Sequence, residues 1–218
     1  MQRYEKQKIK FKIHKNIFEI NLNLGRSTFG SPEHEGNIMS EEEAKTLLKN
    51  WVKNEKLILH MEQVGLLMRS WAKTKEMSAE DQHRWYLAGL LHDADWDQFP
   101  DQHCRRIIEE LERREIDPEI IHAIASHGPK YFGVEPETEM DKMLYAFDEL
   151  SGLIHAYSLM RPTGYEGMAI KGVKKRLKDK SFAAQVSRAD ISDACERAEI
   201  DLNDLIQFII DHQSESIN

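Results

Sequence analysis

The sequence predicts an all-α protein from residue 39 onward, preceded by a short segment of different character. Apolar residues recur at spacings of three and four after Met39, helix-capping signals separate these stretches, and none of them alternates with the period of a β-strand. The chain has 218 residues, of which 31% are charged and 40% hydrophobic. These values suit a globular protein of one domain, with or without an appendage.

Residues 1–38 are net basic and patterned differently from the rest of the chain. Residues 8–13 and 20–24 alternate polar and apolar side chains with a period of two, as the strands of a hairpin do. Ser40 then offers a helix N-cap, and Glu43 completes a capping box. We therefore predict an extension over residues 1–38, either poorly ordered or a small β appendage that aids oligomerisation, and a helical domain over residues 39–218.

Start and stop signals divide this domain into successive helices. Asp117 and Pro118 form a start signal, because aspartate caps a helix and proline suits its first position. Gly128 and Pro129 end that helix, and a loop rich in glycine, proline and aromatic residues follows. We expect helices over residues 41 to about 73 (one or two), 79 to about 92, from Asp101 onward, 118 to 127, 139 to about 159, and 202 to 210.

Composition and charge argue against several classes of protein. No apolar run approaches the roughly 20 residues that span a bilayer, and the N-terminus lacks the apolar block of a secretory signal. Cys104 and Cys195 lie far apart and outside any Cys-x-x-Cys pair, which argues against a disulfide framework or a thiolate zinc site. The formal charge of −8 argues against binding polymeric nucleic acid. We expect a cytoplasmic protein with no membrane partner.

The most informative stretch is Leu90-Leu91-His92-Asp93, which ends an apolar predicted helix. Burying a histidine beside an aspartate is costly unless something offsets their loss of solvent, and a metal ion is a usual partner. Gly89 and the alanine before it lie on the face that carries His92, so another helix can approach closely at the level of the imidazole. At a helix end, the two polar side chains can reach one ion from two sides.

Two further polar residues stand where core residues are expected. His60 interrupts an apolar stripe on its predicted helix, and Asp148 lies on a face of apolar and small residues. One shared ion accounts for His60, His92, Asp93 and Asp148 together. Imidazole and carboxylate without thiolate favour iron, manganese, zinc or magnesium. The alternative for His60 is a core histidine that is hydrogen-bonded to a backbone carbonyl.

This ordered set resembles the HD superfamily of metal-dependent phosphohydrolases, whose signature is His … His-Asp … Asp on a helical bundle. Residues 87–93, 145–154, 161–162 and 180–183 look like the small stand-alone group of predicted HD-superfamily hydrolases. The resemblance covers roughly residues 40–212. It implies an HD-type helical bundle in which the primary metal ligands are His60, His92, Asp93 and Asp148.

The resemblance also points to a second ion, which one branch of the superfamily binds. His127 and His103 match positions that hold that ion. The chain departs from the branch's usual His-Gly-x-x-Gly-Ala, because Cys104-Arg105-Arg106 follows His103. The alternatives are a helix-terminal histidine favoured by the dipole for His127 and a surface residue for His103. We expect one or two divalent ions per chain, chosen from Mn, Fe, Zn, Co and Mg.

These ligands predict hydrolysis of a small phosphorylated substrate, such as a nucleotide, by attack of a metal-bound water on phosphorus. Asp93 is placed to ligate through one oxygen and to orient or deprotonate that water with the other. The phosphoryl oxygens need positive charge, for which Arg161, Lys175 and Lys180 are the candidate catalytic cations. The last two belong to a run of lysines over residues 171–180, whose alternative reading is a solvated surface.

Two other functions stay open at this point. A dinuclear-iron oxygenase on the same scaffold would need both His103 and His127 as ligands. A non-catalytic metal- or nucleotide-binding module would keep the ligands without turnover. The sequence leaves the oligomeric state open, a homo-oligomer included.

Overall fold

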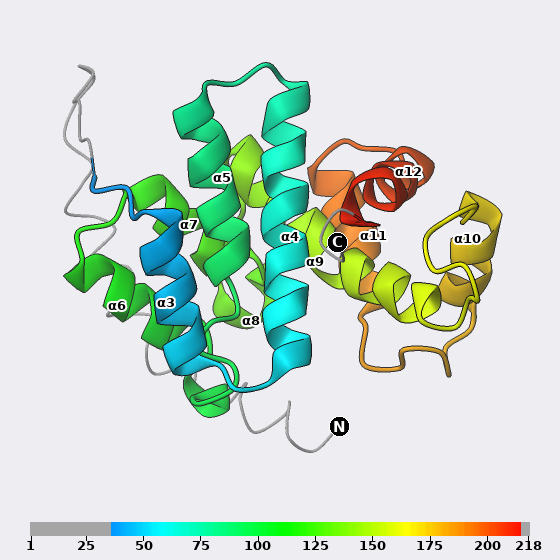
Figure 1. The fold of residues 1–218 in the computed structure, drawn as a ribbon, viewed down its shortest axis with the longest axis horizontal. Helices are drawn as coiled ribbons and strands as arrows, with labels where there is room; N and C mark the ends of the chain where they lie inside the picture. Colours follow the sequence, from blue (N-terminus) through cyan, green and yellow to red (C-terminus); the bar gives the residue numbers. More distant parts are fainter. Residues whose placement is uncertain (1–35, 215–218) are drawn as a thin grey trace.

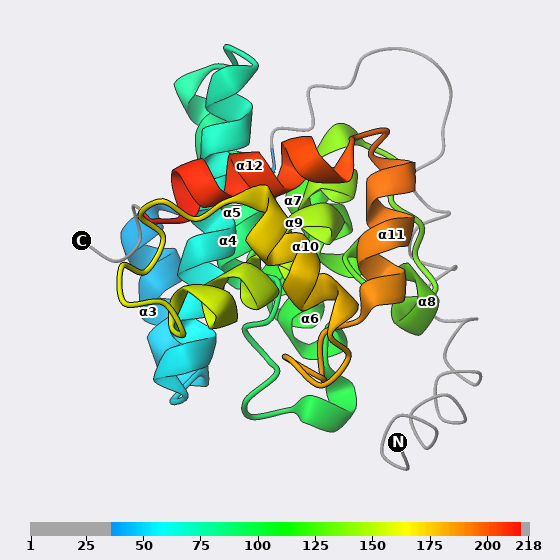
Figure 2. The same ribbon diagram turned by 90° about the vertical axis from the view of Figure 1, so that its right-hand side faces the viewer.

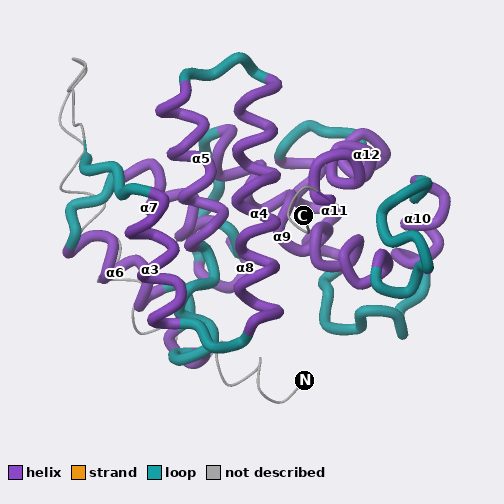
Figure 3. Tube along the Cα trace, viewed as in Figure 1, coloured by secondary structure: helices purple, strands orange, loops and turns teal. Residues whose placement is uncertain are grey.

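The computed structural model describes residues 36–214, and these residues form an all-α bundle (Figures 1 and 3). Within them there are ten α-helices, one short 3-10 helix and no strand, as the sequence predicts. The helices are α3 (Glu41–Trp51), α4 (Glu55–Thr74), α5 (Ala79–Leu91), η1 (Pro100–Gln102), α6 (Arg105–Arg113), α7 (Pro118–Ser126), α8 (Pro129–Phe132), α9 (Glu139–Ser158), α10 (Ile170–Lys178), α11 (Arg188–Arg197) and α12 (Leu202–Gln213).

The first helical stretch is two helices, because the backbone leaves the helical conformation between them. Val52 is extended, and Asn54 then caps α4 by accepting a hydrogen bond from the backbone N–H of Lys56. Ser40 caps α3, and Glu43 returns the second bond of the predicted capping box. Caps of this kind satisfy backbone groups that have no partner inside the helix.

One predicted helix start is wrong. The helix expected from Asp101 begins at Arg105, and Asp101 lies in the separate 3-10 helix η1. Cys104 stands between the two helices with a φ of 70°, a left-handed conformation that interrupts a helix. The carboxylate of Asp95 accepts the backbone N–H groups of Cys104 and Ile107, so the N-terminus of α6 is capped by a residue that precedes η1 in the chain.

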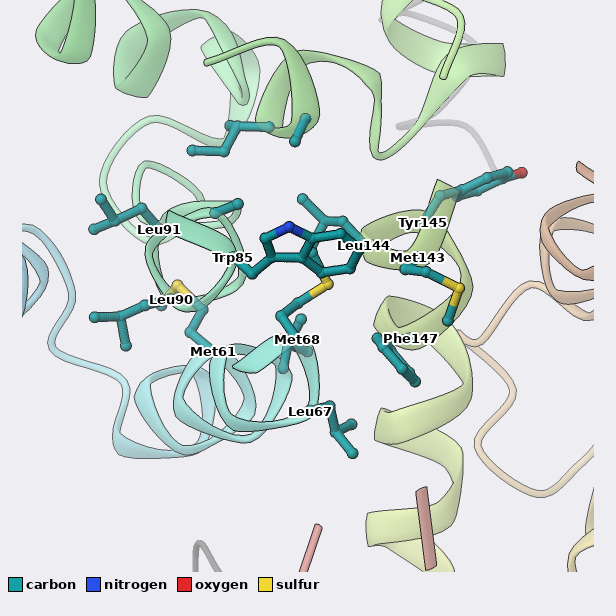
Figure 4. Packing of buried hydrophobic residues seen from close by; sticks show 14 of the residues in the cluster. Met61, Leu67, Met68, Trp85, Leu90, Leu91, Met143, Leu144, Tyr145 and Phe147 are labelled. Atoms are coloured by element: carbon teal, nitrogen blue, oxygen red, sulfur yellow. The ribbon is translucent and has the colours of Figure 1, made fainter. Parts of the chain in front are cut away.

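The core lies where α4, α5 and α9 meet (Figure 4). Its fully buried side chains include Leu67 and Met68 of α4, Leu90 of α5 and Phe147 of α9. Burying each side chain of this size contributes about 1.5–3 kcal/mol relative to leaving it exposed. This apolar contact holds three of the helices that carry the candidate ligands.

Helices α4 and α5 run side by side and cross at two glycines (Figure 1). A Cβ added to Gly89 of α5 would lie 2.7 Å from the Cα of Gly65 in α4. No side chain larger than hydrogen fits at this point, so the two backbones approach closely. The close approach of another helix near His92, predicted from the small residues of α5, is confirmed.

The remaining helices surround this pair. Helix α7 packs on α5 and α9, α6 packs on α7, α12 lies across α4 and α9, and α10 and α11 pack on α9 (Figure 2). Within residues 36–214, every helix is too short or too polar to span a lipid bilayer.

The strand-like alternation predicted near the N-terminus falls within residues 1–35, which lie outside the described part of the chain. The described end of that segment is tied to the loop before α7. The backbone N–H of Asn37 donates to the carbonyl of Glu115 at 2.8 Å, and its carbonyl accepts from the N–H of Asp117 at 3.1 Å. Met39, which follows, is buried in the core.

Candidate metal centre

His92 is fully buried at the C-terminal end of α5. Its Nδ1 lies 2.8 Å from the carbonyl oxygen of Gly89 and donates to it, which leaves Nε2 as the nitrogen that can take up a proton or a metal ion. Among the described residues Nε2 has no hydrogen-bond partner, although Oδ1 of Asp148 lies 3.4 Å away. Buried polar atoms are nearly always satisfied. A buried ring nitrogen that faces carboxylates without a well-formed hydrogen bond fits a site that binds a cation, whether a proton or a metal ion, and this observation supports the metal hypothesis on the structure itself.

His60 and Asp148 complete the first half of the centre from two other helices. Nε2 of His60 in α4 lies 3.1 Å from Oδ1 of Asp148 in α9. The His60 and His92 rings meet edge to face, with their centroids 5.3 Å apart. The structure therefore brings together the four primary ligands that the resemblance implied.

Asp93 faces both halves of the centre. Its Oδ2 lies 3.7 Å from Nε2 of His92, while its Oδ1 lies 3.2 Å from Nε2 of His103 and 3.5 Å from Nε2 of His127. The sequence predicts that one oxygen of Asp93 ligates the ion and that the other orients a water, and the structure places two more histidines beside Oδ1. Two groups of potential ligands share this carboxylate, each with ligand atoms within 4.8 Å of one another: His60, His92 and Asp93, and Asp93, His103 and His127.

His103 and His127 are buried side chains with fixed orientations. His103 is only 8% exposed, so the surface alternative considered for it is wrong. His127 ends α7, and its Nδ1 donates to the carbonyl of Ile124 at 2.6 Å. Nδ1 of His103 pairs with Oδ1 of Asp95 at 2.7 Å. In both residues Nδ1 is occupied and Nε2 faces Asp93, which is the arrangement that a metal ligand needs.

Asp95 is a positioning residue that the sequence reading did not identify. Its fully buried carboxylate holds His103 and also accepts the backbone N–H groups at the start of α6. It therefore fixes both the ring and the segment that carries the ring. In the sequence, Asp95 is marked only by its position two residues after Asp93. That position does not reveal the contact with His103, which lies eight residues further on.

The charges of the centre offset one another in the absence of a cation. Burial lowers the pKa of His92, but Asp93 and Asp148 outweigh it and raise the pKa to about 9. Burial likewise acts against the charged form of His103, and Asp93 and Asp95 raise its pKa to about 9. Burial raises the pKa of Asp93 and Asp148, yet the imidazoles hold both below their ordinary value. Protonated imidazoles thus compensate the negative charge of the carboxylates. A bound divalent cation could take over this role.

The three predicted catalytic cations are not gathered at this centre. The guanidinium of Arg161 donates to the backbone carbonyls of Gly164 and Glu166, at 2.8 and 2.6 Å, and so ties its own loop. Lys175 and Lys180 are exposed on and just after α10. Their part in catalysis remains a prediction.

The helical bundle brings four histidines and two aspartates together, and one of these aspartates is shared by both groups of ligands. Such a set of side chains is typical of a metal-binding domain. Residues 57–153 match the family model of the HD domain. The chain carries an HD domain there, of the HD superfamily of metal-dependent phosphohydrolases. The matched range contains all six residues of the centre. No curated protein and no solved structure matched the chain.

Proposed function

We propose that this protein is a metal-dependent phosphohydrolase that acts on a small phosphate ester, such as a nucleotide. The single observation that carries the proposal is the fully buried Nε2 of His92, which faces two carboxylates inside an HD domain and has no well-formed hydrogen bond within residues 36–214. The class of reaction, metal-dependent hydrolysis of a phosphate ester, is the one typical of the superfamily. The imidazole and carboxylate donors of the centre suit the divalent cation that such a reaction uses.

Two ions can be assigned residues in this proposal. His60, His92, Asp93 and Asp148 would hold the first, and Asp93, His103 and His127 the second. The ligand types suit Mn, Fe, Co, Zn or Mg. When bound, a divalent cation lowers the pKa of a coordinated water to about 7 and withdraws charge from phosphoryl oxygens.

The protein's own contribution is orientation in a buried site. The carbonyls of Gly89 and Ile124 and the carboxylate of Asp95 occupy the Nδ1 atoms of three histidines, which directs their Nε2 atoms to one region. Ligands fixed in this way need no reorganisation when substrate arrives. Burial also keeps bulk water from screening the charges that act on the phosphoryl group.

Phosphate release tests this proposal. Wild type, Asp93→Ala and the matched control Asp101→Ala, an exposed aspartate in η1, would be assayed on nucleotides and sugar phosphates with each candidate cation. We expect turnover by wild type and Asp101→Ala and a loss of at least about a thousandfold in Asp93→Ala, because that residue belongs to both ligand groups. Metal-loaded wild type without activity on any ester would contradict the proposal.

A second candidate is oxidation at a dinuclear iron centre. The observation that favours it is that His103 and His127 both face Asp93, as such a centre requires. It predicts two irons per chain and substrate-dependent uptake of oxygen. A content near one metal ion per chain would exclude it.

A further inference from the structure

A chain of polar side chains lies beside the metal centre, between α4, α9 and α12. Gln63 of α4 follows His60 by three residues and is fully buried. Its amide Nε2 lies 3.1 Å from Nδ1 of His155 in α9. His155 follows Asp148 by seven residues, which is about two helical turns, so both lie on the same face of α9. Gln63 and His155 thus adjoin the centre without belonging to either group of ligands.

Gln213 of α12 sets the direction of the hydrogen bonds in this chain. Its Nε2 lies 3.1 Å from the backbone carbonyl oxygen of Ser151, where only a donor fits, and 2.9 Å from Oε1 of Gln63. Gln63 therefore accepts through Oε1 and turns its own Nε2 to His155. An amide nitrogen only donates, so Nδ1 of His155 must accept. The hydroxyl of Tyr165, which lies 3.1 Å from Nδ1, must then donate to the same nitrogen.

His155 is therefore a neutral imidazole whose proton is on Nε2. Burial and the nearby His60 both lower the pKa of His155, which agrees with an uncharged ring. Among residues 36–214, Nε2 has no hydrogen-bond partner but is reached by solvent. A protonated Nε2 does not bind a metal ion, so His155 is not a further ligand of the centre. It instead offers one N–H donor of fixed direction to a bound molecule.

The space beside α9 is open between Asp148 and His155. Gly152 lies between them on the same face, four residues after Asp148 and three before His155. A Cβ added to Gly152 would meet nothing within 4 Å. The side chains of His60 and Asp148 are 21% and 20% exposed, so the centre itself is open to solvent. A molecule that is bound at the centre through its phosphate therefore has room to extend past Gly152 to His155.

We propose that His155 is a specificity-determining residue that donates its Nε2–H to an uncharged oxygen of the leaving group. The inference rests on the proposed function, because it places the phosphate of the substrate at the His/Asp centre. The rise of a helix over seven residues puts the recognised oxygen about 10 Å from the phosphate. The substrate class is then a phosphate ester with a hydroxyl or carbonyl oxygen at its far end.

The charge of the ring decides which oxygen it suits. A second phosphoryl group is best bound by a cationic donor, because hydrogen bonds between charged groups are roughly twice as strong as neutral ones. His155 becomes cationic only if Nδ1 takes up a proton, and that proton would then face the N–H of Gln63. The ring therefore stays neutral and favours a hydroxyl or a carbonyl oxygen.

Paired esters of simple alcohols test this inference. Butyl, hexyl and octyl phosphate would be compared with the monophosphates and bisphosphates of the corresponding terminal diols, in metal-loaded wild type, His155→Leu, His155→Gln and His83→Leu. In wild type the terminal hydroxyl should raise kcat/KM about fivefold at one chain length, which is the effect of one neutral hydrogen bond. His155→Leu should lose this preference and keep its rate on the plain esters within about twofold, because these make no hydrogen bond there.

Two of these variants control for a merely structural effect. His155→Gln should retain most of the preference, since an amide oxygen can accept from Gln63 while an amide nitrogen donates outward. His83 is a half-buried histidine of α5, nine residues before His92, and it bonds to the backbone carbonyl of Met39. His83→Leu should therefore behave as wild type does.

Phosphonates give a readout that does not depend on turnover, because their P–C bond is not hydrolysed. In calorimetric titrations of metal-loaded wild type, a hydroxyalkyl phosphonate should bind about fivefold more tightly than the plain alkyl phosphonate, and this difference should be absent in His155→Leu. Gly152→Leu fills the open space, so it should abolish binding of the octyl phosphonate and leave that of inorganic phosphate unchanged. Nitrogen NMR of labelled histidine rings should show the proton of His155 on Nε2.

The outcomes separate this inference from the proposed function. Turnover without any preference for the hydroxyl, an equal preference in His155→Leu, a stronger preference for the bisphosphate, or a proton on Nδ1 would overturn the role of His155 and leave the hydrolase in place. A preference among phosphonates that requires His155, with no turnover of any ester, would support that role and overturn the hydrolase. Absence of both turnover and phosphonate binding would contradict both.

Discussion

At the scale of single residues, the centre depends on which ring nitrogen of each histidine carries a proton. Backbone carbonyls occupy Nδ1 of His92 and His127, and a carboxylate occupies Nδ1 of His103. The remaining nitrogen of each ring then faces the shared carboxylate or Asp148. Local backbone geometry at two helix ends, together with one buried acid, thus presets three ligands.

Asp95 provides the sharpest test at this scale. The change Asp95→Asn keeps the shape of the side chain but removes the charge that pairs with Nδ1 of His103. Partners of this kind are worth about 10- to 100-fold in metal affinity. We therefore expect the second ion to bind about 10- to 100-fold more weakly and the first ion to bind as in wild type. Isothermal titration calorimetry with the metal ion measures both affinities, and Asp101→Asn serves as the exposed control.

Equal binding by Asp95→Asn and wild type would show that His103 needs no positioning by this carboxylate. Loss of both ions would instead place Asp95 in the structural support of the whole centre.

At the scale of elements, the contact between α4 and α5 sets the distance between His60 and His92. The two backbones meet at Gly65 and Gly89, and a Cβ added to Gly89 would fall 2.7 Å from the Cα of Gly65. Backbone cannot move aside as a flexible side chain can. The separation of His60 and His92 is therefore coupled to this glycine crossing, which lies five residues from His60 in α4 and three residues from His92 in α5.

The change Gly89→Ala should force the two helices apart. Overpacking of this kind costs about 1–3 kcal/mol in the free energy of unfolding, and we also expect weaker binding of the first ion. Urea unfolding monitored by circular dichroism measures the loss in the free energy of unfolding. The matched control is Gly152→Ala in α9, where an added Cβ meets nothing within 4 Å. That control should be stabilising by about 0.5–1 kcal/mol, because alanine favours a helix interior. A Gly89→Ala protein as stable as the control would contradict the close approach.

The helical fold and the four primary ligands could be predicted from the sequence, because periodicity and polarity are local signals. His60 and Asp148 are recognisable as polar residues on apolar helix faces, and both reach the centre. The role of Asp95 depends on the break between η1 and α6 at Cys104, where φ is positive, and no periodicity reveals that break. The prediction that Lys175 is a catalytic cation rests on a charge run alone, and such a run does not show which of its side chains face the interior.

At the scale of the whole molecule, the protonation of the centre links folding to pH. His92 and His103 each have a pKa of about 9 in the folded, metal-free protein, against 6.5 for a free histidine. Since the folded values are higher, protonation stabilises the folded state. That contribution is complete below about pH 6.5 and is lost as the pH rises through about 9.

We therefore expect the urea midpoint of the chelator-treated protein to fall as the pH rises from about 6.5 to 9. A bound divalent cation takes the place of these protons, so binding releases protons and tightens as the pH rises. The midpoint with Mn²⁺ present should be steady or increase over the same range. Parallel curves with chelator and with Mn²⁺ would show that protons and cation do not compete for the centre.

We infer that six side chains from separate parts of the HD domain form one metal centre that includes Asp93. Elemental analysis of anaerobically purified and metal-reconstituted protein tests it most directly. We expect about two divalent ions per chain in wild type, about one in His127→Ala and none in Asp93→Ala, which loses the carboxylate common to both groups. Wild-type protein that holds no ion after reconstitution, or an Asp93→Ala protein that holds as many as wild type, would contradict it.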